Sequence, residues 1–211
     1  MAQSGTANRL DRRKARTRAA LIAAGRTLLT TRDPAEVSIQ EITDAADVGF
    51  GSFYNHFASK QELFETAVAE VVEEHGAMLD EVTAALGDPA EVFAASVRLT
   101  ARFPKTQPEM AKIIERVGPG YLTAPTGLAP RALRDLQHAK DVGRFAFGDP
   151  QVTIACAGGA VLGVIHLGLL QPEPAAIDHA ADELAANLLR MLGLPGDEAS
   201  EIAARPLPAA G

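Results

Sequence analysis

The sequence predicts an all-α protein in which a small basic head precedes a larger acidic helical body. Apolar residues recur at helical spacing through nearly all of the 211 residues. Helix-capping residues and Pro/Gly breaks divide this pattern into separate segments, and no convincing alternating strand pattern interrupts it. Residues 1–60 hold nine Lys/Arg against six Asp/Glu, whereas the other residues hold eleven against twenty-one. This asymmetry indicates a nucleic-acid-binding end, although a solvated basic tail would give the same charge.

The bulk composition fits an ordinary globular chain. Hydrophobic residues make up 47% and charged residues 22%, which is typical of a soluble domain. The single cysteine, Cys156, excludes an internal disulfide framework and favours a reducing cytoplasm. No basic residue stands next to Cys156 in the sequence to activate a thiol, so we expect a small buried hydrophobe rather than a redox switch. The basic N-terminus shows no apolar secretory signal.

The first sixty or so residues predict three short helices and the start of a long one. Residues 1–11 are expected to be a flexible basic end, and Leu21, Leu28 and Leu29 lie on one face of a first helix. Ser38 and Glu41 have the spacing of a capping box that opens a second helix.

A second pair with capping-box spacing, Ser59 and Glu62, opens a long helix over residues 60–86. Together these elements predict a helix-turn-helix domain over residues 12–72.

The stretch "GFGSFYNHFASKQELF" contains four of the eight phenylalanines in the chain. A third helix follows, capped by Gly49. Phe53 and Phe57 are four residues apart in it, so both face the core of the domain. The outer face then carries Gly51, Ser52, Tyr54, Asn55 and His56. Such a face fits a major groove, with further phosphate contacts expected from Thr17, Arg18, Ser38 and Lys60. The alternative is a small helical cap whose surface is merely polar.

These segments resemble a known family. "RKARTRAALIAAGRTLL" and "VSIQEITDAADVGFGSFYNHFASKQELF" are similar to the DNA-binding domain of TetR-family (tetracycline-repressor-like) transcriptional regulators, most specifically in the core "YNHFASKQEL". The resemblance implies a homodimer that represses transcription by binding double-stranded palindromic operator DNA. It also implies a helical body that binds a small-molecule effector and moves the long helix. Some members activate or need a corepressor.

Carried over by position, the resemblance makes Ser38, Gly51, Ser52, Tyr54, His56 and Lys60 the DNA contacts. The sequence departs from the family at Gly49 and Phe50, where a Ser or Thr cap followed by a polar residue is common. We expect Phe50 either to contact a thymine methyl group in the groove or to pack against the first helix.

Residues 73–195 are expected to form the effector-binding and dimerisation body, and residues 196–211 a disordered tail. Ile154 to Leu170 is an apolar run, which we interpret as a buried helix because it is short for a membrane span and contains His166. No membrane association is therefore expected. Gly159 and Gly163 would allow close helix approach in a dimer interface shared with Leu184 and Leu188. Packing within one chain is the alternative.

The effector pocket is expected among the middle helices of the body, and its aromatic and aliphatic weighting favours an apolar or aromatic effector. The possible polar anchors are Arg98, His138 and His166. The large apolar candidates are Phe93, Val97, Phe103, Met110, Ile114, Tyr121, Phe145 and Phe147.

The sequence also bears on two alternatives to a ligand-responsive regulator, an enzyme and an architectural DNA-binding protein. An enzyme is disfavoured because the five histidines accompany no nucleophile elbow, phosphate loop or zinc-type spacing, and no cofactor is expected. Asp178, His179 and Asp182 could share a helix face around a metal, but a solvated acidic surface explains them better. A purely architectural DNA-binding protein would differ by lacking ligand-dependent release of DNA.

Overall fold

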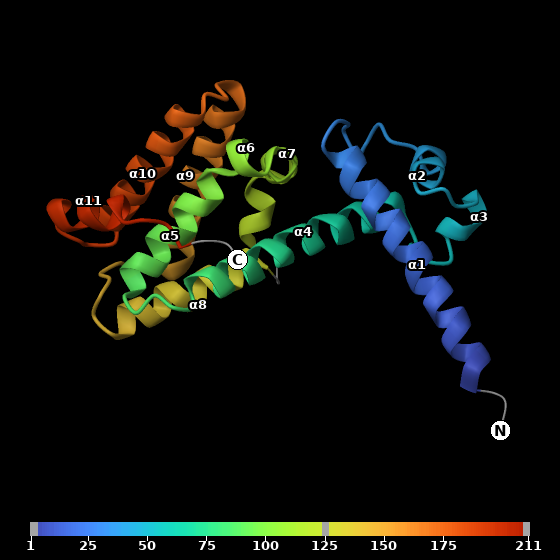
Figure 1. Ribbon diagram of the computed structural model, residues 1–211, viewed down its shortest axis with the longest axis horizontal. Helices are drawn as coiled ribbons and strands as arrows, with labels where there is room; N and C mark the ends of the chain where they lie inside the picture. The colour runs from blue at the N-terminus through green and yellow to red at the C-terminus, as the bar shows by residue number, and fades with distance from the viewer. Residues whose placement is uncertain (1–3, 124–126, 209–211) are drawn as a thin grey trace. The chain divides into compact units, whose positions relative to one another are not determined.

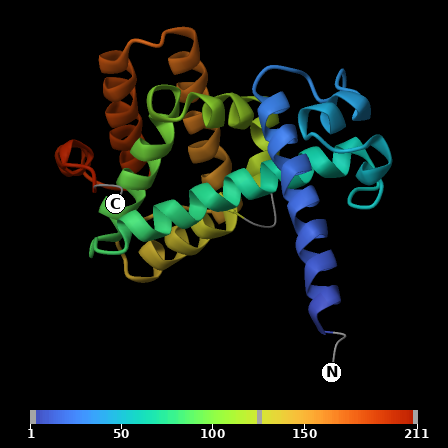
Figure 2. The ribbon, with the colours of Figure 1, turned by 45° about the vertical axis from the view of Figure 1, so that its right-hand side comes forward.

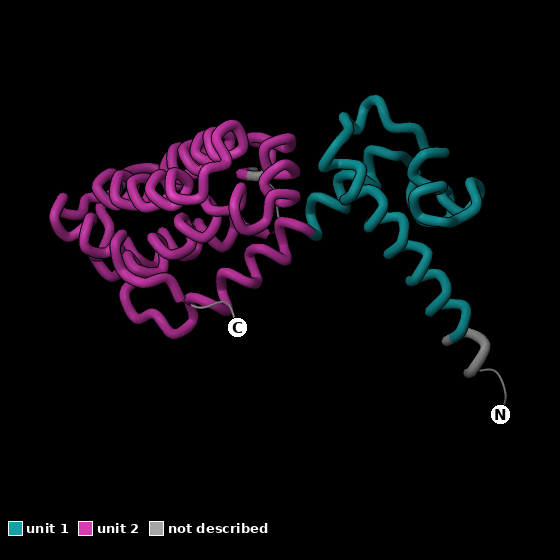
Figure 3. Tube along the Cα trace, turned by 45° about the horizontal axis from the view of Figure 1, so that its top comes forward, with its two compact units in different colours: residues 1–70 teal, residues 71–211 magenta. Residues whose placement is uncertain are grey.

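The computed structural model describes residues 4–123 and 127–208, and this part of the chain contains helices and no strands (Figure 1). The chain divides into two compact units, residues 1–70 and 71–211, coloured separately in Figure 3. One helix, α4 (Lys60–Thr83), contributes residues to both units. The all-α prediction is confirmed.

Unit 1 contains α1 (Ser4–Leu29), α2 (Ile39–Ala45), α3 (Phe50–Phe53) and the beginning of α4. Its core is built from side chains of all four helices and of the turn after α3, and the predicted core residues Phe53 and Phe57 are both buried. The N-terminal prediction needs correction, because α1 already begins at Ser4. Thr17 and Arg18 therefore lie within α1 and not at its start.

The predicted caps of unit 1 are largely confirmed. Ser38 and Glu41 form a reciprocal capping box at the start of α2. At the second pair, the Ser59 hydroxyl accepts from the Glu62 N–H, but the Glu62 carboxylate accepts from the N–H of Ala58, one residue before the cap. The turn between α2 and α3 holds Asp47 at a φ of 52°, a left-handed conformation that Asp tolerates better than most residues.

In the described residues of unit 2, the rest of α4 packs with seven further helices and a 3₁₀ turn, and Figure 2 shows these elements from a second direction. Asp88 and Asp149 cap helices whose first residue is proline. Helix α5 packs along α10, and α9 contacts α5, α6, α7, α8 and α10. The elements are α5 (Pro89–Ala101), α6 (Phe103–Thr106), α7 (Pro108–Val117), η1 (Gly118–Thr123), α8 (Leu128–Asp141), α9 (Pro150–Leu170), α10 (Pro174–Met191) and α11 (Gly196–Ala204).

The expectation of a disordered tail over residues 196–211 needs correction, because Gly196–Ala204 form the helix α11. Ala199, Ile202 and Ala203 bury one face of this short helix against the body. Just after it, the Arg205 carbonyl accepts a hydrogen bond of 2.6 Å from the buried Arg98 guanidinium. A composition rich in Ala and Pro suggested disorder, but small side chains at helical spacing still allow close packing.

Helix α9 has two distinct faces. Among the described residues it is the one helix long and apolar enough to cross a membrane by length and composition. One face is buried in the body through Ile154, Val161 and Ile165. The other leaves Leu167 and Leu170 more than half exposed. The prediction of a buried helix therefore holds for one face only.

Candidate nucleic-acid interface and ligand pocket

The head presents an exposed aromatic surface along α3 and the turn after it. Phe50 and Tyr54 are 47% and 56% exposed, and their rings meet edge to face with centroids 6.0 Å apart. Tyr54 also stacks edge-on against the buried Phe53 at 5.4 Å, so the core fixes its outward position. Because Phe50 is nearly half exposed and its recorded ring contact is with Tyr54, the structure favours the exposed position over packing against α1.

Small and polar residues complete this surface. Gly51 and Asn55 are exposed, and Ser52 is half-buried. A Cβ at Gly51 would meet no atom within 4 Å, so the backbone is open to close approach by a partner. These positions agree with the predicted outer face of a recognition helix.

Arg18 connects the head core to its charged surface. Its guanidinium lies over the ring of Phe57, 4.8 Å from the centroid, and 3.9 Å from the Glu70 carboxylate. The Arg18 side chain remains 42% exposed and so stays accessible to a phosphate, whereas the neighbouring Thr17 is half-buried.

His56 is less exposed than the sequence predicts. Its Nδ1 is buried and has no hydrogen-bond partner among the described residues. Burial lowers the pKa of His56, and the nearby charges of Lys14 and Arg18 lower it further. The imidazole is therefore neutral at neutral pH, beside two basic side chains that favour an anionic partner.

Two of the predicted phosphate contacts, Lys60 and Ser38, make hydrogen bonds within the head. The Lys60 ammonium donates to the carbonyls of Ala35 and Val37, at 2.7 and 2.8 Å, and so ties the start of α4 to the segment before α2. The Ser38 hydroxyl is engaged with the Glu41 carboxylate at 2.7 Å. Hydrogen bonds from the Ser38 N–H and hydroxyl hold the pKa of Glu41 below its ordinary value.

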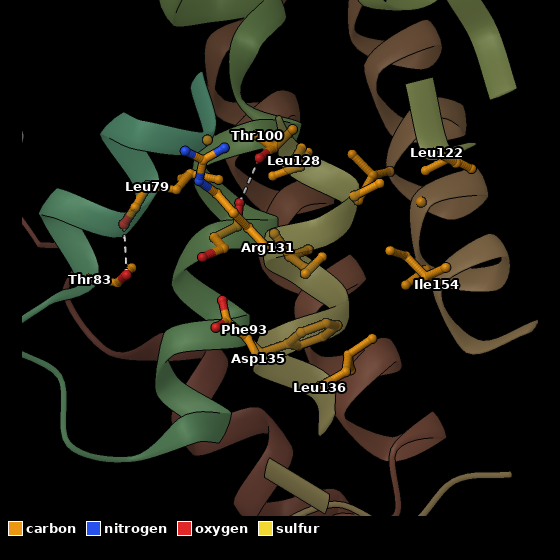
Figure 4. Close-up of a pocket in the computed structure, with 18 of the residues that line it drawn as sticks. Leu79, Thr83, Phe93, Thr100, Leu122, Leu128, Arg131, Asp135, Leu136 and Ile154 are labelled. Carbon is orange, nitrogen blue, oxygen red and sulfur yellow. Dashed lines mark hydrogen bonds between the residues drawn. The ribbon is translucent and has the colours of Figure 1, made fainter. Parts of the chain in front are cut away.

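The body contains a pocket bounded by α4, α5, η1, α8 and α9. The pocket is partly open to solvent, and most of its lining residues are apolar. In Figure 4, Leu79 and Thr83 lie on one side and Leu122 and Ile154 on the other. The large apolar wall residues are Leu79, Phe93, Val97, Leu122, Leu128, Leu136, Ile154 and Val161.

Three charged residues, Asp80, Arg131 and Asp135, line this mostly apolar pocket, together with the hydroxyl-bearing Thr83, Ser96 and Thr100. The Arg131 Nε donates to Asp80 at 2.8 Å, and Arg134 donates to the other oxygen of the same carboxylate at 2.7 Å. Burial raises the pKa of Asp80, but the hydrogen bonds from Arg134 and Arg131 outweigh it and leave the pKa lowered. Asp80 is therefore ionised at neutral pH.

One glycine shapes the pocket wall. A Cβ at Gly158 would lie 2.1 Å from a methyl carbon of Leu122, so a larger residue here would force the Leu122 side chain to move.

The sequence identified the pocket walls only in part. Phe93 and Val97 line the pocket. Phe103, Ile114 and Phe145 are buried elsewhere in the core, and Met110 and Phe147 pack on it without lining the pocket. The side chain of Tyr121 lies outside the described residues.

The expected polar anchors, Arg98, His138 and His166, do not line this pocket. His166 is exposed and pairs with the Glu115 carboxylate, and His138 is also exposed. Arg98 donates to Asp182 at 2.7 Å. Sequence reasoning missed Asp80, Arg131 and Asp135. A signal was present in the helical spacing, because Leu128, Arg131, Asp135 and Leu136 share one face of α8.

The predicted dimer residues separate into two groups. Gly159 and Gly163 are exposed, and a Cβ at either would meet no atom within 4 Å. Leu184 and Leu188 are 7% and 5% exposed and belong to the core of this chain, as the alternative interpretation held. Cys156 lies on the exposed face of α9, which corrects the expectation of a buried thiol.

The acidic cluster on α10 pairs with α5 and α6. Arg102 donates to Asp178 at 2.8 Å and to Asp182 at 2.7 Å, and Lys105 donates to Asp178 at 2.6 Å. Lys105 and Arg102 lower the pKa of Asp178 by hydrogen bonding. No group of three potential metal ligands occurs in residues 4–123 and 127–208. The carboxylates therefore serve helix packing.

The fold, the exposed face of the head and the pocket of the body together define a class of protein. A helix-turn-helix head with an exposed recognition face, joined by one continuous helix to a body with a mostly apolar pocket, is the architecture of a ligand-responsive transcription regulator.

Comparison with known proteins defines the family. Residues 21–67 match the bacterial regulatory proteins of the tetR family, and residues 88–205 match the tetracyclin repressor-like C-terminal domain. The chain belongs to the TetR family and is a DNA-binding transcriptional repressor.

Several relatives are similar over most of the chain. The crystal structure of RolR without ligand is 36% identical, covers 92% of this chain and all of its own, and has a TM-score of 0.77. RolR in complex with resorcinol is 34% identical, covers 95% of this chain and all of its own, and has a TM-score of 0.68. The probable acrEF/envCD operon repressor of Escherichia coli K12 is 26% identical, covering 83% of this chain and 86% of the relative.

Proposed function

We propose that the protein binds a palindromic operator as a homodimer and is released from it by a small aromatic molecule that carries hydroxyl groups. The observation that supports this most directly is the set Asp80, Arg131 and Asp135 in a pocket whose walls are mostly apolar. Apolar surfaces with a few convergent polar groups are typical of sites that bind and orient one small ligand.

The donors and acceptors of this pocket suit a phenol. A phenolic hydroxyl donates to a carboxylate and accepts from a guanidinium, while its ring packs against side chains such as Phe93. An anionic ligand would be repelled by the two carboxylates. The similarity to RolR, which was crystallised with resorcinol, supports a dihydroxybenzene. The apolar or aromatic effector expected from the sequence is thereby narrowed to an aromatic ring with polar substituents.

For the DNA side, we propose that α3 enters the major groove with Phe50 and Tyr54 among the contact residues. The second subunit would pack on the exposed face of α9 around Gly159 and Gly163. A dimer of this kind places two recognition helices in successive major grooves, about 34–36 Å apart or somewhat more. The exposed Leu167 and Leu170 on the same helix would be covered in the dimer.

The two activities are coupled through α4 in this proposal, since α4 is shared by both units. The effector must bind the DNA-incompetent state more tightly than the DNA-bound state, because coupling between two ligands is reciprocal.

Titration calorimetry with resorcinol tests the ligand class. We expect the wild type to bind, and Asp135→Asn to weaken binding about 10- to 100-fold, because a hydrogen bond to a charged group contributes about 1.5–3 kcal/mol. Asp141→Asn, on the exposed end of the same helix, is the matched control and should bind like the wild type. Absence of resorcinol binding, or equal loss in both variants, contradicts the proposal.

A further inference from the structure

Arg131 lies across α4 and joins two carboxylates of that helix. Its Nη1 and Nη2 donate to both oxygens of Glu73, at 2.9 and 2.6 Å, while its Nε donates to Asp80 at 2.8 Å. Glu73 and Asp80 are seven residues apart, so they lie two turns apart on the same face of the helix. A planar guanidinium with its five donors in a fixed fork is suited to such a bridge, and lysine is not.

The backbone of α4 is adapted to this contact. A Cβ at Gly76, midway between the two carboxylates, would lie 2.9 Å from Nη1 and 3.0 Å from Cδ of Arg131. The guanidinium therefore rests directly on the helix backbone.

At the start of α8, the Gly127 carbonyl accepts a further bond of 2.9 Å from Nη1. Gly127 has a φ of 83°, and a Cβ there would lie 2.6 Å from a methyl carbon of Val72 on α4. Both helices thus have glycine where they approach most closely.

The two carboxylates differ in their access to a ligand. Asp80 and Arg131 line the pocket, whereas Glu73 does not. A hydroxyl group that binds Asp80 must compete with the Nε of Arg131 for the same oxygen, Asp80 Oδ2. Glu73 does not line the pocket, so the ligand hydroxyl does not compete for its carboxylate. The Glu73 side chain is half exposed to solvent.

We propose that Arg131, Glu73 and Gly76 form a latch that holds α8 on α4 in the ligand-free protein, and that a ligand hydroxyl opens it by taking Asp80 from Arg131. Opening moves the guanidinium away from Gly76 and also breaks its pair with Glu73. This inference rests on the proposed ligand class and adds its regulation. Glu73 is then a residue that stabilises the ligand-free state without touching the ligand.

The latch predicts the sign of a mutational effect. Glu73→Gln removes an interaction that exists only in the closed state, so the cost of opening falls and ligand affinity rises. If Glu73 instead held Arg131 in position for the ligand, the same substitution would weaken binding.

The test is calorimetry with resorcinol on the full-length chain. Glu73→Gln is compared with Glu81→Gln, which removes the same charge from an exposed position on α4. We expect Glu73→Gln to bind resorcinol about two- to five-fold more tightly than wild type, the range of an exposed ion pair. Gly76→Ala, which displaces the guanidinium, should act in the same direction. Affinity that is unchanged relative to Glu81→Gln, or weaker, overturns the latch.

A second measurement separates the latch from the ligand class. Without ligand, amide hydrogen exchange in residues 72–83 should be faster in Glu73→Gln and Gly76→Ala than in Glu81→Gln. If the wild type binds no resorcinol, the proposed ligand class is wrong and exchange alone decides whether the closed latch exists. Equal exchange in all three variants overturns it.

Discussion

The head and the body of this protein differ in how their functional residues are distributed along the chain. The exposed face of the head comes from residues 50–56, within about two helical turns. The charged set of the pocket comes from α4 and α8, and the Arg131–Asp80 bond joins residues 51 positions apart. Local signals such as caps and aromatic spacing are therefore enough to locate the first surface, whereas the second depends on tertiary packing.

The largest contrast we expect is between two neighbouring aromatics of the head. Phe53 is fully buried and Phe50 is 47% exposed. Phe53→Ala should lower the free energy of unfolding by about 3–5 kcal/mol, because it leaves a cavity. Phe50→Ala should change stability by less than about 0.5 kcal/mol, as surface substitutions do.

Urea unfolding of both variants checks the difference in stability. Operator binding checks the exposed role, because Phe50→Ala should alter base preference. Unchanged preference at every operator position would remove Phe50 from the groove.

A second prediction concerns pH and the body. Burial lowers the pKa of His75 to about 4 from an ordinary 6.5. Below pH 6.5 the unfolded chain therefore binds a proton that the folded chain does not. Stability is fully present above pH 6.5 and should fall by about 1.4 kcal/mol per pH unit toward pH 4.

Urea titrations at pH 7 and pH 5 measure this slope. His75→Gln should flatten it in part, because His56, whose pKa is also lowered, remains. An equal slope in wild type and variant would contradict the buried neutral imidazole.

The smallest expected effect concerns Lys60. Lys60→Met removes two charged hydrogen bonds to backbone carbonyls, and we expect a loss of about 1–2 kcal/mol of stability. Its operator affinity should keep the salt dependence of the wild type. A lysine that neutralised a phosphate would instead lower the slope of log K against log salt by about one.

The sequence predicted the helical elements well because their signals are local. Ser38 caps α2 as its capping-box spacing predicted, and Asp88 and Asp149 cap helices that begin with proline. Leu184 was misplaced because a leucine at helical spacing has the same pattern at a dimer interface and in a core. The tail helix α11 was missed because its buried face consists of two alanines and one isoleucine.

The pocket anchors were missed for a different reason. Asp80 and Arg131 are charged, and a search for apolar walls discards charged residues. Asp80 and Arg131 belong to two different helices. Only the packing of these helices brings the two side chains together, half-buried, in the pocket wall. The pairing of distant charges is not visible in a single sequence.

The most direct test of the whole account is a salt-titrated binding assay on the DNA upstream of the protein's own gene, with and without resorcinol, for wild type and Tyr54→Ala. We predict that the wild type binds this DNA more tightly than random DNA and that resorcinol releases it. Tyr54→Ala should lose DNA binding and keep resorcinol binding. Binding that is equal on random DNA, indifferent to Tyr54 and unaffected by resorcinol would contradict the account.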